Sequence, residues 1–301
     1  MKKIDPLVSV IINCFNGEKY LDQALDSILK QTYNNWEVIF WDNKSTDKSY
    51  NIYKNYADND KRFKYFFAEN HTLLYEARNL ALKNCVGEVI TFLDVDDIWI
   101  PTKLEKQISL FDNDKVGLVY GNFSIFNQYN KKYKLAFNQN LVSGYILDDL
   151  LKHYCVGLLT IAIRTNAIQE YIKFFNDQYH IIGDFDAVIK ISKNWKILAI
   201  QEPIAISRKH SESESYKNRF LLGEELKIWL KNAERDEILS KKNLSYIKND
   251  YLYSMAVHYS LSGKKIKAME IILKLKLGLY LWKLIISIFL PKKINNYFNK
   301  L

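Results

Sequence analysis

The chain has 301 residues, of which 48% are hydrophobic and 14% aromatic, and its formal net charge at pH 7 is +9. This length and composition allow a large buried core, and the scarcity of Gly and Pro argues against a disordered protein. The basic balance suits an anionic partner such as a nucleotide, an acidic lipid or a nucleic acid. Three scattered cysteines, Cys14, Cys85 and Cys155, argue against a disulfide framework or a zinc site.

The sequence predicts neither export nor a membrane span. Residues 1–6 precede the first predicted strand and are too short, and lack the apolar run, for a signal peptide. No uncharged run reaches the roughly 18–20 residues that a membrane-spanning helix needs. We therefore expect a protein made in the cytosol, with its thiols reduced.

Strands and helices alternate through the first hundred residues. Apolar runs bounded by turn residues predict four strands, and apolar residues at helical spacing predict three helices between them. The predicted strands are residues 7–12, 36–41, 63–67 and 89–94, and the predicted helices are residues 20–29, 48–56 and 73–84. Such alternation implies right-handed βαβ units, and therefore a Rossmann-like, mostly parallel sheet with helices on both faces.

The elements are less regular after residue 100. The predicted helices are residues 102–111, 146–151 and 187–194, and the predicted strands are residues 117–126, 133–137, 159–164, 196–200 and 205–208. A turn near residues 130–131 makes the first two of these strands a hairpin. From residue 216 the chain is charged and helical, with amphipathic segments at 220–230 and 246–261. We therefore expect an α/β domain at residues 1–215 and a helical extension at residues 216–301.

Polar clusters follow three of the predicted strands, where ligands bind to parallel sheets. The clusters are residues 13–16, Asp42 and residues 94–97. Because side chains two apart in an extended segment share a side, Asp94 and Asp96 are expected to point the same way. Clustered carboxylates repel unless a cation lies between them, and Mg²⁺ or Mn²⁺ would also bind phosphates. The alternative is a solvated acidic loop.

Six segments, in order along the chain, resemble motifs of the family 2 inverting glycosyltransferases of the GT-A fold. They are residues 9–21, 42–47, 77–79, 94–97, 183–186 and 208–215. The resemblance covers about residues 7–216. Asn13-Cys14 stands where the family usually has Pro-Thr, and Gly183-Asp184 stands where it usually has Glu-Asp.

The resemblance implies a nucleotide-binding half at residues 1–100, and an acceptor-binding and catalytic half at residues 101–215. It places the uracil of a UDP-sugar on Asp42, the ribose on Asp94, and a Mn²⁺ or Mg²⁺ ion on Asp96, with Arg78 near the base or diphosphate. The residues expected at the nucleotide sugar are Asn13, Phe15, Glu18, Asp42, Arg78, Asp94 and Arg208, and those expected at the metal are Asp94, Asp96 and His210.

The implied reaction moves a sugar from a nucleoside diphosphate to a hydroxyl of a glycan or lipid-linked glycan. A metal at Asp96 would neutralise the leaving diphosphate, with Arg78, Arg208 and His210 as helpers. A carboxylate acting as general base is worth about 10²–10⁴-fold, and Asp184 is the predicted base. Asp186 is its competitor, unless it lies in the following helix. A single displacement of this kind inverts the anomeric carbon.

Residues 266–290 are almost entirely apolar apart from one stripe. On a helix, Lys276, Tyr280, Lys283 and Ser287 would share that stripe, and Pro-Lys-Lys follows at 291–293. This pattern predicts an interfacial helix on the cytoplasmic face of a bacterial inner membrane. The alternative is a helix packed on the protein itself or in a dimer.

Three other functions remain as alternatives. A nucleotidyltransferase would also join such a sheet with carboxylates and metal, but it usually has a loop richer in Gly and basic residues than residues 13–19. A nucleic-acid-binding protein would use the positive charge, but no such motif is present, so no nucleic-acid partner is expected. A catalytically dead scaffold is disfavoured by the intact Asp94, Asp96 and Asp184. The sequence leaves the donor sugar, the acceptor and the oligomeric state open.

Overall fold

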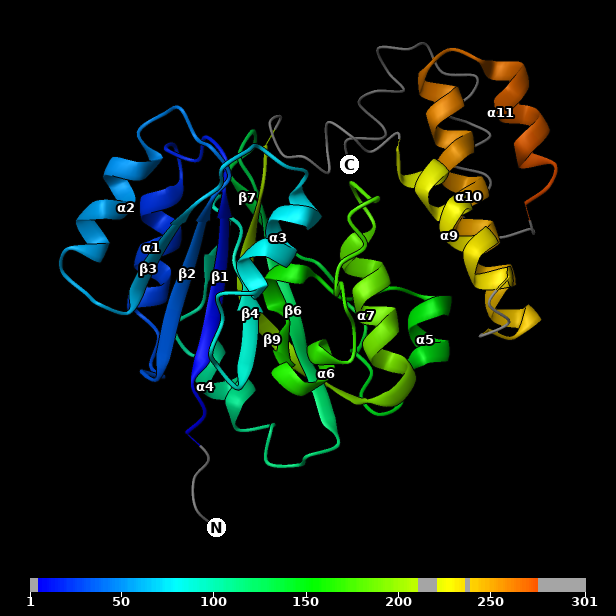
Figure 1. The fold of residues 1–301 in the computed structure, drawn as a ribbon. Coiled ribbons are helices and arrows are strands. Elements are labelled where there is room, and N and C mark those ends of the chain that lie inside the picture. The colour runs from blue at the N-terminus through cyan, green and yellow to red at the C-terminus, as the bar shows by residue number, and fades with distance from the viewer. Residues whose placement is uncertain (1–4, 211–220, 236–238, 276–301) are drawn as a thin grey trace. The chain divides into compact units, whose positions relative to one another are not determined.

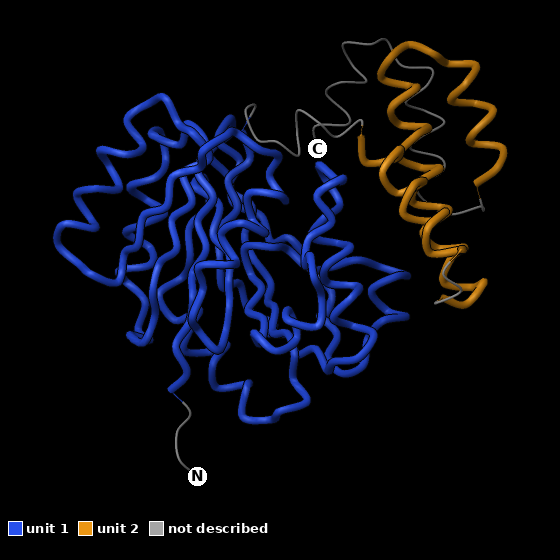
Figure 2. The backbone as a smooth tube through the Cα atoms, viewed as in Figure 1, with its two compact units in different colours: residues 1–211 blue, residues 212–301 orange. Residues whose placement is uncertain are grey.

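The computed structural model describes residues 5–210, 221–235 and 239–275. The chain forms two compact units, residues 1–211 and residues 212–301, which we call the α/β unit and the helical unit (Figure 2). The boundary predicted at 215/216 falls within residues 211–220, outside the described residues.

The first half of the α/β unit is a parallel sheet built from βαβ units (Figure 1). Its strands are β1 (Val8–Cys14), β2 (Trp36–Asp42), β3 (Phe63–Phe67) and β4 (Val89–Phe92), in the spatial order β3-β2-β1-β4. The helices between them are α1 (Leu21–Leu29), α2 (Ser49–Ala57) and α3 (Leu74–Leu82). Since all four strands run the same way, their carboxyl ends meet at one edge, which we call the carboxyl rim.

The second half extends the same sheet in the order β4-β8-β6-β9-β5, with β7 paired to β6. These strands are β5 (Ile98–Trp99), β6 (Val116–Asn127), β7 (Lys132–Leu135), β8 (Ala162–Arg164) and β9 (Lys196–Lys209). Only β6 and β9 pair in parallel here, and the other pairs are antiparallel. The α/β class, the flanking helices and the hairpin of β6 with β7 confirm the prediction.

Helices cover both faces of the sheet, as the nearly continuous apolar strands require. On one face, Val10 and Ile12 of β1 belong to one core cluster with residues of α1, α2 and α4 (Lys103–Ile108). On the other face, α3 packs on β1 and β2. The ring of Phe175, from the segment before α7 (Gly183–Asn194), lies 5.4 Å from Phe92 and 5.5 Å from Tyr75 of α3.

Several predicted boundaries are wrong. The strands expected at 196–200 and 205–208 are one 14-residue strand, β9, because its pairing with β6 continues past Pro203 through shifts in register. The strand expected at 159–164 is a short 3₁₀ turn, residues 158–160, followed by β8. Helix α7 begins at Gly183, four residues before the predicted start, with Asp184 and Asp186 in its first turn, where acidic side chains favour a helix.

The helical unit contains α9 (Leu221–Arg235), α10 (Lys241–Leu261) and α11 (Lys265–Ile272), which confirms a helical extension. The single helix predicted over 266–290 is wrong in its first part, because α11 ends at Ile272 and a turn follows. Ala268 and Ile272 of α11 pack with Ala256 of α10. The stripe from Lys276 onward lies outside the described residues. Within the described part of the chain, no helix has the length and apolar character to cross a bilayer.

Candidate active site

The Asp94–Asp97 segment is a turn at the carboxyl rim, and not the extended end of a strand. Strand β4 ends at Phe92, and the Asp97 N–H donates to the Asp94 carbonyl at 3.1 Å. The expected extended geometry of Asp94 to Asp96 is therefore wrong, and strand alternation does not apply to their side chains. The two carboxylates have different partners.

Asp94 is paired with Arg78. The Arg78 Nη2 lies 2.7 Å from Asp94 Oδ1, and the guanidinium lies 5.2 Å from the Tyr75 ring centroid and 5.9 Å from that of Phe175. The Arg78 side chain is 4% exposed, whereas that of Asp94 is 39% exposed. A buried, fixed arginine therefore orients a carboxylate whose other oxygen can still reach a ligand.

Asp96 contacts the residues that follow β9. Its Oδ2 lies 2.8 Å from His210 Nε2, and its carbonyl accepts from Arg208 Nε at 3.1 Å. Arg208 also donates to Gln23 at 2.7 Å, and its guanidinium lies 4.7 Å from the ring centroid of Tyr20. The structure thus brings together the predicted metal residues Asp96 and His210, which are 114 positions apart. Residues 211–215 of the same motif lie outside the described residues.

Asp97 is a buried structural carboxyl that the sequence identified only as the start of a turn. Its Oδ1 accepts from the Arg208 backbone N–H at 3.0 Å, which ties β9 to the turn. Burial, followed by the nearby charges of Asp96 and Asp94, raises the pKa of Asp97 well above its ordinary value. Three carboxyl groups therefore lie close together here, where a cation would relieve their repulsion.

A buried polar network anchors both ends of this turn. The side chains of Thr91, Trp99 and Gln107 donate to three successive carbonyls, those of residues 161, 159 and 160 respectively. The Lys103 ammonium joins them, 3.0 Å from the Thr91 hydroxyl, 2.7 Å from Gln107 Oε1 and 3.9 Å from the Trp99 ring centroid. Thr91, before the acidic turn, and Trp99, after it, are therefore held by the same hydrogen-bond network.

Asp42 lies at the end of β2 with both carboxylate oxygens bonded. Its Oδ1 accepts from the Ser45 N–H at 2.7 Å, and its Oδ2 accepts from the Tyr65 hydroxyl at 2.8 Å. The side chain is held in place, and Asp42 pairs in register with Cys14 at the end of β1. Tyr65 is a site residue that sequence reasoning missed, because it comes from β3, two strands away from β1.

Asn13 lies beside Trp41 at the neighbouring ends of β1 and β2. Within the described part of the chain, the Asn13 amide nitrogen and the Trp41 indole N–H are buried without a hydrogen-bond acceptor. Buried unpaired donors are rare in proteins, so these two are suited to an acceptor atom of a ligand. Phe15 is half exposed, with its ring 4.2 Å from that of His71.

Glu18 is engaged within the protein. Its carboxylate accepts from the Lys48 N–H at 3.0 Å, and its own N–H donates to Asp47 at 2.9 Å. These bonds join the loop after β1 to the loop after β2. Glu18 therefore helps to hold these two loops together at the carboxyl rim, and the residue is exposed.

Asp184 lies in the first turn of α7. Its Oδ1 accepts from the Phe185 N–H at 2.8 Å and lies 3.3 Å from the Tyr75 hydroxyl. Burial raises the pKa of Asp184, and the charge of Arg78 opposes that shift. Arg78 therefore acts on both Asp94 and Asp184, and it connects the predicted nucleotide side with the predicted base. Asp186 instead pairs with Lys190 one turn along the helix, at 2.7 Å.

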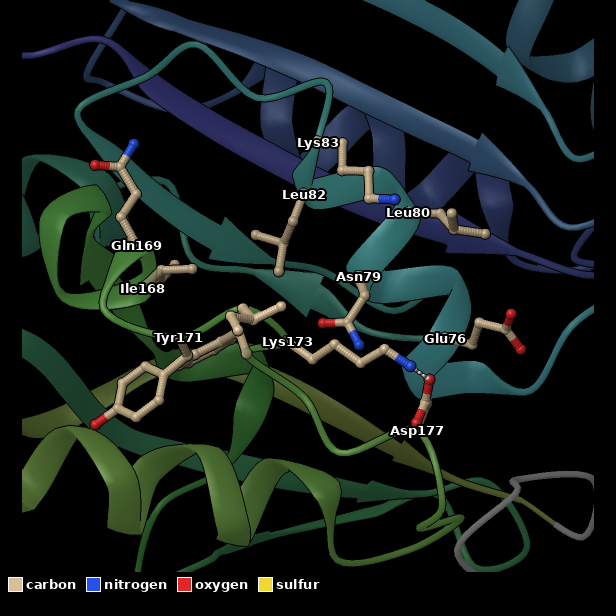
Figure 3. Close-up of a pocket in the computed structure, with 12 residues that line it drawn as sticks. Glu76, Asn79, Leu80, Leu82, Lys83, Ile168, Gln169, Tyr171, Lys173 and Asp177 are labelled. Atoms are coloured by element: carbon tan, nitrogen blue, oxygen red, sulfur yellow. Dashed lines mark hydrogen bonds and ion pairs between the residues drawn. The ribbon is translucent and has the colours of Figure 1, made fainter.

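The segment before α7 is fastened to α3. Asn79 donates to the Phe175 carbonyl at 2.7 Å and accepts from the Phe175 N–H at 3.0 Å. A pocket of about 480 Å³ lies between α3 and residues 168–177, and Asn79 is one of the residues that line it. The Lys173–Asp177 ion pair also lines this pocket (Figure 3). None of the predicted site residues lines that pocket.

The residues at the acidic turn fit a divalent cation only in part. Among the described residues, no group of three or more His, Cys, Asp or Glu side chains is arranged to hold a metal ion. Asp96 and His210 supply one carboxylate oxygen and one imidazole nitrogen within 2.8 Å of each other. Mg²⁺ and similar ions are commonly held by one or two protein ligands together with substrate phosphates, so this pair fits such an ion bound with a diphosphate.

The model of glycosyl transferase family 2 matches residues 9–195. The chain belongs to glycosyl transferase family 2. Membership of this family favours sugar transfer over the nucleotidyltransferase and nucleic-acid-binding alternatives.

Two curated relatives are similar over a little more than half of the chain. The UDP-Glc:alpha-D-GlcNAc-diphosphoundecaprenol beta-1,3-glucosyltransferase WfgD of Escherichia coli is 35% identical over 56% of this chain and 64% of its own length. The putative teichuronic acid biosynthesis glycosyltransferase TuaG of Bacillus subtilis is 32% identical over 54% of this chain and 66% of its own length. This chain thus matches just under two thirds of the length of either relative.

Two solved structures share the fold. The structure of Staphylococcus aureus TarS residues 1–349 in complex with UDP-GlcNAc has a TM-score of 0.64 at 18% identity, over 88% of this chain and 80% of that one. The mannosyltransferase PcManGT of Pyrobaculum calidifontis, in complex with GDP-Man and Mn²⁺, has a TM-score of 0.60 at 15% identity, over 98% of this chain and 85% of that one. At these identities the likeness supports the GT-A fold.

Proposed function

We propose that this glycosyltransferase moves a sugar from a UDP-sugar to a hydroxyl of a glycan or lipid-linked glycan, with inversion at the anomeric carbon. The observation that carries the proposal is the buried Arg78. The Arg78 guanidinium pairs with Asp94 at 2.7 Å, and its charge opposes the rise in the pKa of Asp184. One buried arginine therefore acts on both the carboxylate proposed to bind the nucleotide and the proposed base. Residues 1–100 supply the nucleotide-binding half, and residues 101–215 supply the acceptor half.

The donor is proposed to be a uridine nucleotide because of Asp42. Its carboxylate is pre-oriented by Ser45 and Tyr65 at the carboxyl rim and retains lone pairs for the ring N–H of uracil. The unpaired donor of Asn13 suits a carbonyl or hydroxyl of the same nucleotide. The name of the Escherichia coli relative gives UDP-Glc as donor, and the bound sugar nucleotide of TarS is UDP-GlcNAc.

We infer a Mn²⁺ or Mg²⁺ requirement. Asp96 and His210 would hold the ion, with Asp94 close by, and the ion would neutralise the charge that develops on the leaving diphosphate. The side chain of Arg208 donates to the Asp96 carbonyl and stacks near Tyr20, so it keeps the Asp96 turn in place. The mannosyltransferase PcManGT was solved with Mn²⁺, which supports the choice of metal.

Asp184 is proposed to remove the proton from the acceptor hydroxyl as that hydroxyl attacks the sugar. Burial raises the pKa of Asp184, which makes it a stronger base than an exposed carboxylate, and a general base works best when its pKa approaches the working pH. A carboxylate that acts as a base toward the acceptor supports a single displacement, and a single displacement inverts the anomeric carbon.

The acceptor is proposed to be carried on a lipid at the cytoplasmic face of a bacterial inner membrane. The name of the Escherichia coli relative describes an acceptor of this kind, a sugar on diphosphoundecaprenol. The chain itself contributes a basic and apolar sequence after residue 275, ending in the Pro-Lys-Lys of residues 291–293. Such a sequence suits an anionic bilayer surface.

The test is UDP release from a panel of UDP-sugars, with and without EDTA, by the full chain and two variants. Asp96→Ala should lose metal-dependent binding of UDP, because it removes the carboxylate ligand. Asp184→Asn should keep UDP affinity within about twofold and lose transfer by at least about 10²-fold, the contribution of a general base. Weakened UDP binding by Asp184→Asn, or no turnover of any UDP-sugar by the wild type, would overturn the proposal.

A further inference from the structure

Gly183 lies directly against the ring of Tyr75. A Cβ atom at position 183 would be 2.6 Å from two ring carbons of Tyr75 and 2.7 Å from a third, closer than real Cβ contacts come. Tyr75 is buried, at 3% exposed, and its ring is stacked near Phe175, so it has little room to move away. A glycine is therefore needed at 183 for the ring to lie where it does.

The Tyr75 hydroxyl reaches past Gly183 to the start of α7. It donates to the Ile181 carbonyl at 3.0 Å and lies 3.3 Å from Asp184 Oδ1. Burial, followed by the charge of Asp184, raises the pKa of Tyr75 well above its ordinary value, so the phenol stays a neutral donor at any working pH. The Tyr75 side chain thus contacts the Ile181 carbonyl, Gly183 and the Asp184 carboxylate.

We propose that Tyr75 is the positioning residue of the Asp184 base, and that the lack of a side chain at Gly183 admits the Tyr75 ring. This inference rests on the proposed function, in which Asp184 is the base. The aromatic ring occupies the space where any side chain at position 183 would begin. The hydroxyl, shared between the Ile181 carbonyl and the carboxylate, then fixes the direction in which Asp184 points.

Within the described residues, the hydroxyl of Tyr75 is the side-chain hydrogen-bond donor to Asp184, and the other charged and titratable groups nearby act without such a bond. From α3 comes Arg78, which acts through its charge, and from the segment before the 3₁₀ turn comes Tyr154, whose ring lies 5.1 Å from that of Phe185. The charged side chains of the neighbouring helix α5 (Leu147–Lys152) are Asp148, Asp149 and Lys152, and the pair Asp186–Lys190 lies on α7 itself. The Tyr75 bond lowers the pKa of Asp184 against the effect of burial.

The first test is Tyr75→Phe, which keeps the ring on Gly183 and removes only the hydroxyl. Without its donor, Asp184 should take up a proton at higher pH, so the acidic limb of the kcat profile should move to higher pH. We expect kcat to fall at least about threefold further at pH 6 than at pH 8, while UDP affinity stays within about twofold. The matched control is Tyr171→Phe, which removes a hydroxyl bonded to the Lys190 carbonyl at the far end of α7 and should leave the profile unchanged.

The second test does not need turnover. Titration of the Asp184 carboxyl by ¹³C NMR, assigned by its loss in Asp184→Asn, should show a higher midpoint in Tyr75→Phe than in the wild type. Gly183→Ala should lose transfer while keeping UDP affinity, because the new methyl displaces the Tyr75 ring. An identical titration and an identical pH profile in Tyr75→Phe would overturn the role of Tyr75. If the wild type transfers no sugar, the proposed function fails, but the titration still shows whether the Tyr75 hydroxyl bonds to the Asp184 carboxylate.

Discussion

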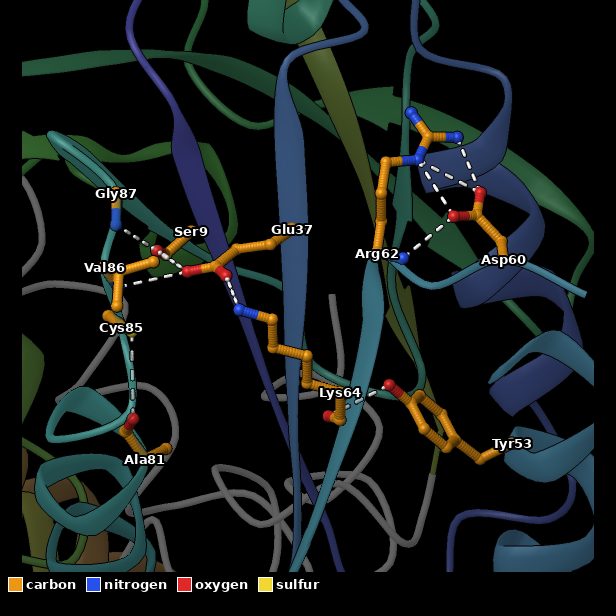
Figure 4. Close-up of polar contacts among 10 residues, drawn as sticks. All are labelled: Ser9, Glu37, Tyr53, Asp60, Arg62, Lys64, Ala81, Cys85, Val86 and Gly87. Carbon is orange, nitrogen blue, oxygen red and sulfur yellow. Dashed lines mark hydrogen bonds and ion pairs between the residues drawn. The ribbon is translucent and has the colours of Figure 1, made fainter. Parts of the chain in front are cut away.

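Replacing Glu37 by Ala is expected to destabilise the α/β unit by about 3 kcal/mol, mainly through hydrogen-bond donors left unpaired. Glu37 is buried near the amino end of β2, whereas Asp42 ends the same strand at the carboxyl rim. Figure 4 shows Glu37 with its polar partners. Its Oε1 accepts from the Ser9 hydroxyl at 2.6 Å and from the Val86 N–H at 3.1 Å, and its Oε2 pairs with Lys64. One carboxylate therefore joins β1, β2, β3 and the entry to β4.

The magnitude follows from these three partners. A buried donor left without its acceptor costs about 1–3 kcal/mol. The Ser9 hydroxyl is fully buried and the Val86 N–H bond is partly buried, so the two losses together come to about 3 kcal/mol. Removing one partner of a fully buried ion pair costs about 3–5 kcal/mol, but the Lys64 side chain is 43% exposed and can be hydrated instead, so its share is small. For a unit of this size, about 3 kcal/mol lowers Tm by roughly 6–12 °C.

The assay is urea unfolding and thermal melting of the full chain at pH 7. The control is Asp58→Ala, which removes an exposed partner of Lys54 and should cost less than about 1 kcal/mol. UDP affinity should stay the same in both variants, because neither residue lies at the carboxyl rim. A Glu37→Ala variant no less stable than the control would refute the reasoning.

The stability lost in Glu37→Ala is expected to depend on pH. Burial alone would raise the pKa of Glu37, but the donors Lys64, Ser9 and Val86 outweigh it, and the pKa is lowered below its ordinary value. The stabilisation is therefore present above the unfolded-state pKa of about 4.3 and is lost as the pH falls through the lower folded-state pKa. The gap in stability between wild type and Glu37→Ala should narrow in acid and stay constant between pH 6 and 8.

Three further predictions concern the site and the tail. Asp42→Asn should weaken UDP binding by about tenfold or more in calorimetry, since the charged acceptor for the uracil N–H is lost, and Tyr65→Phe should weaken it less. His210→Ala should raise the Mn²⁺ concentration that gives half-maximal UDP release, and an unchanged metal titration would remove His210 from the metal site. Deleting residues 276–301 should abolish binding to anionic vesicles while UDP binding persists, and retained vesicle binding would contradict a membrane role for this segment.

The sequence by itself predicted the order of the elements from β1 to β4, and the resemblance of its motifs indicated the family. Apolar runs separated by helical spacing are local patterns, and they are enough to predict a parallel sheet whose strand ends carry Asn13, Asp42 and Asp94. Motif order along the chain, from residues 9–21 to 208–215, was equally readable. The order of these elements depends on neighbours in the chain, so periodicity predicts it, whereas the family was inferred from the resemblance of the motifs.

Only the tertiary structure decided what each site residue contacts. The turn at residues 94–97 sends Asp94 to Arg78 and Asp96 to His210, because a hydrogen bond from Asp97 ends the strand alternation. Tyr75 meets Gly183 across 108 positions of sequence, and no local pattern encodes that pairing. A fully buried Lys103 is also unpredictable from sequence, since its burial depends on acceptors that the fold brings together from distant segments.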